Sequence, residues 1–294
     1  MFITNDVSLI TFVPFAMLTL RKCNQEKLLI PVIIVQTLAA NLGSMLTPIG
    51  NPQNLYLYNL AEMKMSTFIG IIGPYTLTSG ILLLLSVAVV CRKKEKIEFT
   101  LEENNSDHEI EKERLHLRRK AHQKNAVYLI LFLMSLLVVV RVLPYYVAFI
   151  VVFVTVFIMD RQVLKTVDYS LILTFIAFFI FTGNIGEIET IRNVLQEFVS
   201  GREVGVGIAA SQVISNVPAA LLLSGFTKDY AKLLVGVNIG GLGTLIASMA
   251  SLIPYKIYAH HYNEQKGKYF RWFTIANVGY LAVLLAVYGL IRWM

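Results

Sequence analysis

Long apolar runs alternate with short polar breaks along this chain, and the runs are long enough to cross a hydrocarbon layer of about 30 Å. The first part of the pattern predicts a helical arm over 7–20, an interrupted span over 28–58 and a continuous span over 68–91. After a polar stretch, the pattern predicts spans over 126–140, 144–159 and 168–185, a surface segment to 201, a hairpin over 204–226, an interrupted span over 230–255 and a last span over 270–293. The sequence therefore predicts an all-α membrane protein in contact with the lipid bilayer.

Two of the apolar runs contain similar polar sequences. The segment 41–51 (NLGSMLTPIGN) resembles the segment 238–248 (NIGGLGTLIAS), and each follows a short hydroxyl-Asn pair, Thr4-Asn5 and Ser215-Asn216. Gly, Asn and Thr are weak helix formers and Pro is weaker, so both runs are expected to unwind within the membrane. Broken helices at matching places in two halves are typical of the midplane substrate site of a secondary transporter.

The charged residues predict the orientation of these spans. The chain is 56% hydrophobic and 15% charged, with a formal net charge of +7. Most of the 26 Lys and Arg residues fall in segments 21–27, 92–125, 160–167 and 256–271, which the positive-inside rule places in the cytoplasm. The two interrupted spans then cross a cell membrane in opposite directions, which predicts inverted repeats. Because the positive charge follows the spans, a nucleic-acid partner is not expected.

The halves differ in length. We expect a partial first repeat over 1–91, a cytoplasmic linker over 92–125 and a complete second repeat over 126–294. Three spans and a hairpin arm precede Ser215, whereas almost nothing precedes Thr4, so the first repeat is predicted to be incomplete. A start site further upstream, a gene fragment, or a partner that supplies the missing spans would each account for this difference.

The hairpin tips and helix breaks supply the candidate site. Backbone N–H and C=O groups freed from a helix need other partners, and a bound ion or anion is one such partner. The candidate ion-binding and substrate-binding residues are Thr4, Asn5, Asp6, Asn41, Ser44, Thr47, Gly50, Asn51, Asn54, Ser215, Asn216, Asn238, Gly240, Gly241, Gly243, Thr244 and Ser248. Na⁺ is predicted at Asn5, Asp6 and Asn216. The alternative is that the small residues only let helices pack closely, as the Gly236 and Gly240 spacing does.

Asp6 is the acidic residue that this pattern places inside the membrane. Ionisable residues there commonly face a cavity or an ion pathway, so Asp6 is a candidate to coordinate Na⁺ or to carry a proton. The alternative is a carboxyl group neutralised by hydrogen bonds to the hairpin backbone. No Ser/His/Asp, Cys/His or paired-acid set occurs at a credible depth, so we do not expect an enzyme, and the only expected cofactor is the coupling ion, Na⁺ or H⁺.

The motifs at the tips and breaks resemble those of the ion transporter superfamily, which includes citrate-transporter-like permeases, arsenite permeases, sodium/dicarboxylate symporters and one class of sodium/proton antiporter. The resemblance is carried by the segments 4–7 (TNDV), 40–54 (ANLGSMLTPIGNPQN), 215–219 (SNVPA) and 237–240 (VNIG). It implies an inverted-repeat fold with re-entrant hairpins and two broken transmembrane helices, an elevator-like motion and a homodimer. Asp6 and Val217 replace hydroxyl residues found in dicarboxylate symporters, which argues against a dicarboxylate substrate.

The leading functional expectation is secondary active transport of a small anion, or exchange of Na⁺ for H⁺, with Asp6 on the cation side of the coupling. A different class of function stays open beside it. In that alternative the chain is a truncated, non-transporting membrane subunit, or a pseudogene-like fragment of such a permease.

Overall fold

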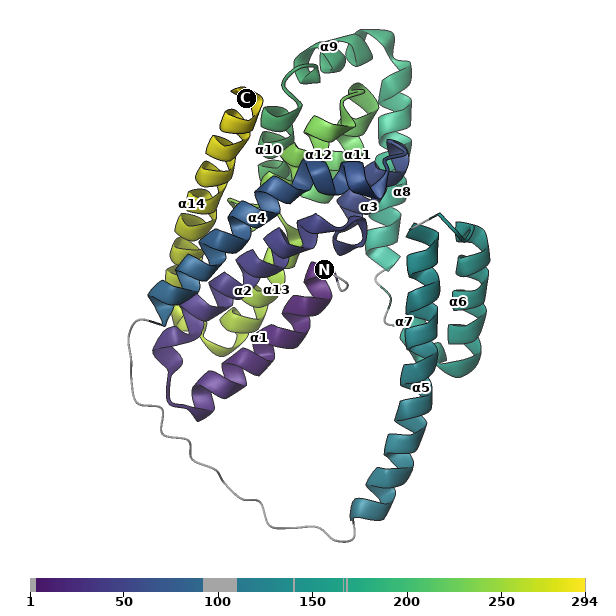
Figure 1. Ribbon diagram of the computed structural model, residues 1–294, viewed down its shortest axis with the longest axis vertical. Helices are drawn as coiled ribbons and strands as arrows, with labels where there is room; N and C mark the ends of the chain where they lie inside the picture. The colour runs from purple at the N-terminus through teal and green to yellow at the C-terminus, as the bar shows by residue number, and fades with distance from the viewer. Residues whose placement is uncertain (1–3, 92–109, 140, 166, 168, 294) are drawn as a thin grey trace. The chain divides into compact units, whose positions relative to one another are not determined.

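The computed structural model describes residues 4–91, 110–139, 141–165, 167 and 169–293 (Figure 1). These residues form helices and turns and contain no strand. The chain divides into two compact units, one formed by 1–100 and 173–294 and the other by 101–172. The division into 1–91, 92–125 and 126–294 stays a prediction.

The first part of the larger unit contains the first interrupted helix. Its helices are α1 (Asn5–Lys22), α2 (Leu29–Gly43), α3 (Pro52–Leu60) and α4 (Met65–Val90). Between α2 and α3 the chain forms two short 3-10 turns, Ser44–Leu46 and Pro48–Gly50, joined at the extended residue Thr47. Pro52 starts α3, where its missing N–H is not needed by the helix. The run over 28–58 is therefore interrupted, as predicted.

The second part of the larger unit also contains an interrupted helix. Its helices are α8 (Tyr169–Glu187, from residue 173 on), α9 (Glu189–Val199), α10 (Glu203–Ile214), α11 (Asn216–Leu223), α12 (Tyr230–Ile239), α13 (Met249–His261) and α14 (Lys266–Trp293). Ser215 separates α10 from α11 with a φ of 73°. The second interruption lies between α12 and α13, so the predicted break in this run is confirmed.

The smaller unit contains α5 (Ile110–Val139), α6 (Tyr145–Met159) and α7 (Arg161–Lys165). The spans predicted over 126–140 and 144–159 correspond to the end of α5 and to α6. Lys124 Nζ on α5 pairs with Asp160 Oδ2 at 2.9 Å, just after α6 ends. The later part of the predicted linker is helical, and residues 92–109 lie outside the described residues.

Among the described residues, three helical stretches are long and apolar enough to cross a membrane: Glu26–Leu46, Met65–Val90 and Asn263–Trp293. A fourth is counted if the bent pair Ile172–Ile185 and Glu189–Val199 forms one span. Leucines such as Leu77 and Leu84 on α4 are 70% and 72% exposed, as expected for a lipid-facing surface. These features are those of a multi-pass membrane protein.

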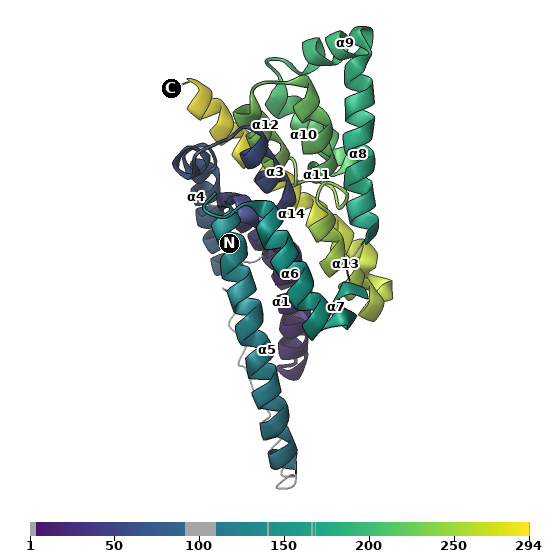
Figure 2. The same cartoon turned by 90° about the vertical axis from the view of Figure 1, so that its right-hand side faces the viewer.

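Helices α10 and α12 pack against each other, and both views show them next to α11 (Figures 1 and 2). A Cβ atom on Gly236 would lie 2.8 Å from Val204 Cα, and one on Gly240 would lie 2.7 Å from Ser211 Oγ. Small residues therefore let the two backbones approach here. Close packing accounts for Gly236 and Gly240, the alternative considered for such residues.

Gly50 is required by the shape of the first interruption. A Cβ atom at this position would overlap the carbonyl oxygen of Ser44, because the two 3-10 turns fold back on one another. Gly50 N also donates to Thr47 O at 3.2 Å.

We expect Gly50→Ala to lower the free energy of unfolding by about 1–3 kcal/mol, because the added methyl group forces the backbone of Ser44 to move. The midpoint of thermal unfolding of the purified protein in detergent measures this. Gly80→Ala on α4 is the matched control, since its Cβ atom would meet nothing within 4 Å. Equal midpoints for the two variants would contradict the close approach at Gly50.

Candidate functional site

Two buried asparagines join the two interrupted helices. Asn41 Nδ2, in the last turn of α2, donates to Ser251 Oγ in the first turn of α13 at 2.9 Å. Asn238 Nδ2, in the last turn of α12, donates to Asn54 Oδ1 in the first turn of α3 at 2.7 Å. Asn54 follows Asn41 at the same spacing at which Ser251 follows Asn238, so the two hydrogen bonds join corresponding positions of the two similar segments.

These bonds connect the four half-helices crosswise. The end of α2 meets the start of α13, and the end of α12 meets the start of α3. Such an exchange of partners is expected when two broken helices pass each other in opposite directions. Figure 1 shows the same relation, with the chain rising from α2 to α3 and descending from α12 to α13.

Both predicted hairpin tips contact an interruption. Asn5, the first residue of α1, donates through Nδ2 to Asn41 Oδ1 at 3.3 Å, and Ser248 Oγ donates to the same oxygen at 3.3 Å. Asn216, the first residue of α11, donates through its backbone N–H to Ala247 O at 3.0 Å. Ser215 Oγ donates to the same carbonyl at 3.5 Å. Residues predicted separately at tips and breaks therefore lie together.

Side-chain amides satisfy several of the peptide groups that the interruptions free. In the first break, Asn54 Nδ2 donates to Met45 O at 3.1 Å and to Thr47 O at 3.3 Å. Ser44 Oγ donates to Asn41 O at 2.9 Å. These groups are bound within the protein, which lowers the number available to a ligand.

In the second break, the side-chain amide of Gln212 on α10 satisfies free peptide groups. Its Nε2 donates to Gly240 O and Leu242 O, each at 2.9 Å, and its Oε1 accepts from Thr244 N at 3.0 Å. Gly243 leaves room for it with a φ of 111°, because a Cβ atom there would overlap Gln212 Oε1. Gln212 was not among the predicted residues; the signal available in the sequence was a single amide in the apolar helix just before the Ser215 tip.

Four buried amide oxygens have no hydrogen-bond partner within the described part of the chain: Asn51 Oδ1 and Asn238 Oδ1 at the interruptions, Gln36 Oε1 on α2 and Asn277 Oδ1 on α14. Asn51 precedes α3 one turn before Asn54, and Asn54 contacts Asn238, so the two oxygens belong to neighbouring parts of one site. Uncharged oxygen ligands of this kind suit a hard cation such as Na⁺. Within the described residues, no group of three or more His, Cys, Asp or Glu side chains could hold a metal ion.

Three other predicted residues, Asp6, Thr4 and Gly241, do not take part in the hydrogen bonds that join the interruptions. Asp6 is partly buried, and its backbone N–H donates to Asn5 Oδ1 at 3.0 Å. Thr4 precedes α1, and its carbonyl accepts from Ser8 N at 3.1 Å. Gly241 lies close to Asn216, since a Cβ atom on Gly241 would be 2.8 Å from Asn216 Nδ2. The roles of Asp6 and of Na⁺ at Asn5, Asp6 and Asn216 stay predictions.

Apolar helices and two joined interruptions characterise a helical membrane transporter, and the comparisons with known proteins agree. The chain belongs to the citrate transporter family, whose model matches residues 1–234. It is 34% identical to an uncharacterized transporter of Methanocaldococcus jannaschii over 99% of this chain and 76% of that protein. It is 30% identical to the inner membrane protein YbiR of Escherichia coli over 87% of this chain and 65% of that protein. No solved structure matches it.

The second break should open more readily without the amide of Gln212. In Gln212→Met the side chain keeps its approximate size but loses its three hydrogen bonds to the second break, each worth about 1 kcal/mol. We expect the amide hydrogen of Thr244 to exchange at least about tenfold faster. Hydrogen exchange followed by mass spectrometry measures this rate. Gln196→Met, at an exposed position on α9, is the matched control, and equal exchange in both variants would contradict the role given to Gln212.

Proposed function

We propose that this protein is a secondary active transporter that moves a small anion in exchange for, or together with, Na⁺ or H⁺. The observation that carries the proposal is the crosswise pair of buried hydrogen bonds from Asn41 to Ser251 and from Asn238 to Asn54. Continuous helices are sufficient for a protein to cross a membrane, so interruptions need another reason. Two corresponding interruptions joined at their ends therefore favour a binding site.

The same bonds support an inverted repeat. Equivalent residues exchange partners across the two copies, which is the relation that a two-fold axis in the membrane plane produces. In this proposal the tips, the interruptions and their arms move together past the remaining spans, and the site opens to each side of the membrane in turn. Membership of the citrate transporter family supports an anionic substrate.

We infer that the coupling cation binds at the unpartnered amide oxygens of the interruptions. Asn51 Oδ1 and Asn238 Oδ1 are buried without partners among the described residues, and a Na⁺ ion bound there would supply one. Asn5, Asp6 and Asn216 remain the proposed second set of ligands, with Asp6 the group able to exchange Na⁺ for H⁺. The anion would bind beside the cation, where their charges attract each other at short range in a poorly screened site.

Reconstitution into liposomes tests this function. We expect uptake of at least one of citrate, succinate, acetate, phosphate or arsenite when an inward Na⁺ gradient or pH gradient is imposed, and no uptake above background without the gradient. Circular dichroism before and after reconstitution shows that the protein remains helical. Helical protein with no flux for any of these anions would overturn the proposal and favour the alternative of a non-transporting membrane subunit.

The cation site predicts a specific variant. In Asn51→Ala one of the two lone oxygens is lost, so the Na⁺ concentration that gives half-maximal uptake should rise at least about tenfold. Asn59→Ala is the matched control, because Asn59 lies near the end of α3, the helix that Asn51 precedes, and its exposed side chain donates to Leu55 O of its own helix at 3.0 Å. An unchanged Na⁺ dependence in Asn51→Ala would contradict a cation at this place.

A further inference from the structure

A separate cavity of about 660 Å³ lies in the larger unit, and none of its lining residues makes the hydrogen bonds that join the interruptions. It is bounded by α3, α8, α9 and the loop that follows the 3-10 turn Ser224–Phe226. Its lining contains one cationic side chain, Lys228, and no carboxylate. A cavity of this size is in the range that holds a small molecule.

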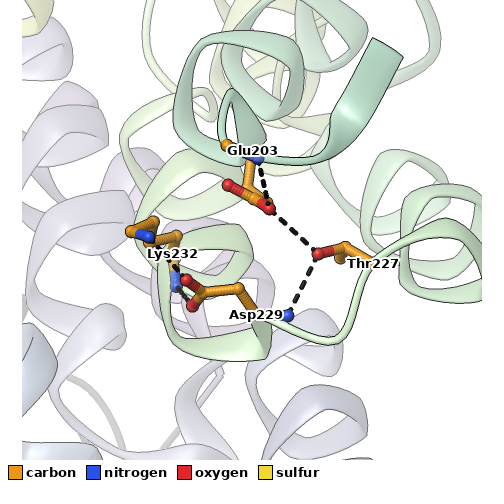
Figure 3. A network of polar contacts seen from close by, with 5 residues as sticks. Glu203, Thr227, Asp229 and Lys232 are labelled. Carbon is orange, nitrogen blue, oxygen red and sulfur yellow. Dashed lines mark hydrogen bonds and ion pairs between the residues drawn. The ribbon is translucent and has the colours of Figure 1, made fainter. Parts of the chain in front are cut away.

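The charge of Lys228 is available to a ligand. The neighbouring acid, Asp229, is already paired with Lys232, at 2.7 Å between Oδ2 and Nζ, and it also accepts from Lys232 N at 3.0 Å (Figure 3). Burial raises the pKa of Asp229, but the hydrogen bonds and charge of Lys232 outweigh this effect and lower that pKa below its ordinary value. Among the described residues, no ion pair includes Lys228.

The loop that carries Lys228 is anchored on both sides. Thr227 Oγ1 donates to Glu203 Oε1 at 3.1 Å and accepts from Asp229 N at 3.0 Å, as Figure 3 shows. Glu203 is only 3% exposed, and its Oε1 also accepts from Gly201 N at 3.0 Å. A buried carboxylate therefore fixes the residue before Lys228, and the start of α12 fixes the residue after it.

The rest of the lining suits an organic anion with an apolar body. The Tyr56 ring stands edge-on to the Phe179 ring at 5.6 Å between centroids. The Tyr56 hydroxyl is bonded to Ser224 Oγ at 2.8 Å, which holds the ring in place. Gln196 adds an amide donor to the lining, whereas the hydroxyl of Thr182 already donates to Phe178 O at 2.7 Å. One cation, neutral donors and aromatic surface match a single carboxylate on an apolar group better than a citrate-like ion with several charges.

We propose that this cavity binds a small organic monocarboxylate, with its carboxylate at Lys228 and its apolar part against Tyr56 and Phe179. The proposal deepens the proposed transport function, because such an ion would be held close to α3 and its interruption. Binding at this cavity does not itself require transport, so the two are measured separately.

Benzoate is the probe, and benzamide is its uncharged counterpart of nearly the same shape. Isothermal titration of the purified full chain in detergent, with empty micelles subtracted, gives both affinities. We expect benzoate to bind, and benzamide to bind at least about tenfold more weakly. Lys228→Met should lose about tenfold or more in benzoate affinity, while Lys228→Arg should keep most of it because the charge remains.

Lys64→Met, at an exposed position before α4, is the control for loss of one positive charge elsewhere and should bind benzoate normally. The thermal midpoint of each variant shows whether it is folded. Equal affinity for benzoate and benzamide, or unchanged benzoate affinity in Lys228→Met, overturns the site. If the unaltered chain binds benzoate but moves no anion in liposomes, the proposed transport function is overturned and the proposed binding site is supported. If the chain transports an anion but does not bind benzoate, the binding site is overturned and the transport function is supported.

Discussion

The central constraint on this structure is that a helix interrupted inside an apolar environment leaves peptide groups that water cannot reach. Each such group is destabilising by several kcal/mol when it lacks a partner. Here carboxamide side chains supply the partners, Asn54 in the first interruption and Gln212 in the second. A carboxamide has two donors and an acceptor, so one residue can bind two carbonyls and still contact a neighbouring segment.

This arrangement links the local backbone to the proposed chemistry. Asn54 binds the carbonyls of its own break and accepts from Asn238 beside the other break, so its side chain links the two interruptions. The oxygens left over are neutral and buried, which favours a weakly held cation over a permanent metal site. Helix α3 also carries Tyr56, and therefore connects the interruption to the cavity at Lys228.

Much of the architecture follows from sequence alone. Clusters of Gly, Asn, Thr and Pro within apolar runs correctly located both interruptions, and Ser215-Asn216 correctly located the turn between α10 and α11, because these residues disfavour helix at any depth. The comparisons also confirm the family resemblance that these motifs carried. The pairing of Asn238 with Asn54, the role of Gln212 and the burial of Glu203 depend on which helices approach one another. Apolar periodicity contains no such information, since a polar residue facing a neighbouring helix and one facing solvent look the same.

The contact between α10 and α12 has a mechanical consequence. Where Gly236 meets Val204 and Gly240 meets Ile208, backbone lies against backbone, and the glycines themselves have no side chain that could move aside. A relative shift of α10 and α12 would therefore force their backbones into collision. Because Gln212 on α10 also binds the second interruption, we expect α10, α12 and this interruption to move together if the protein changes shape.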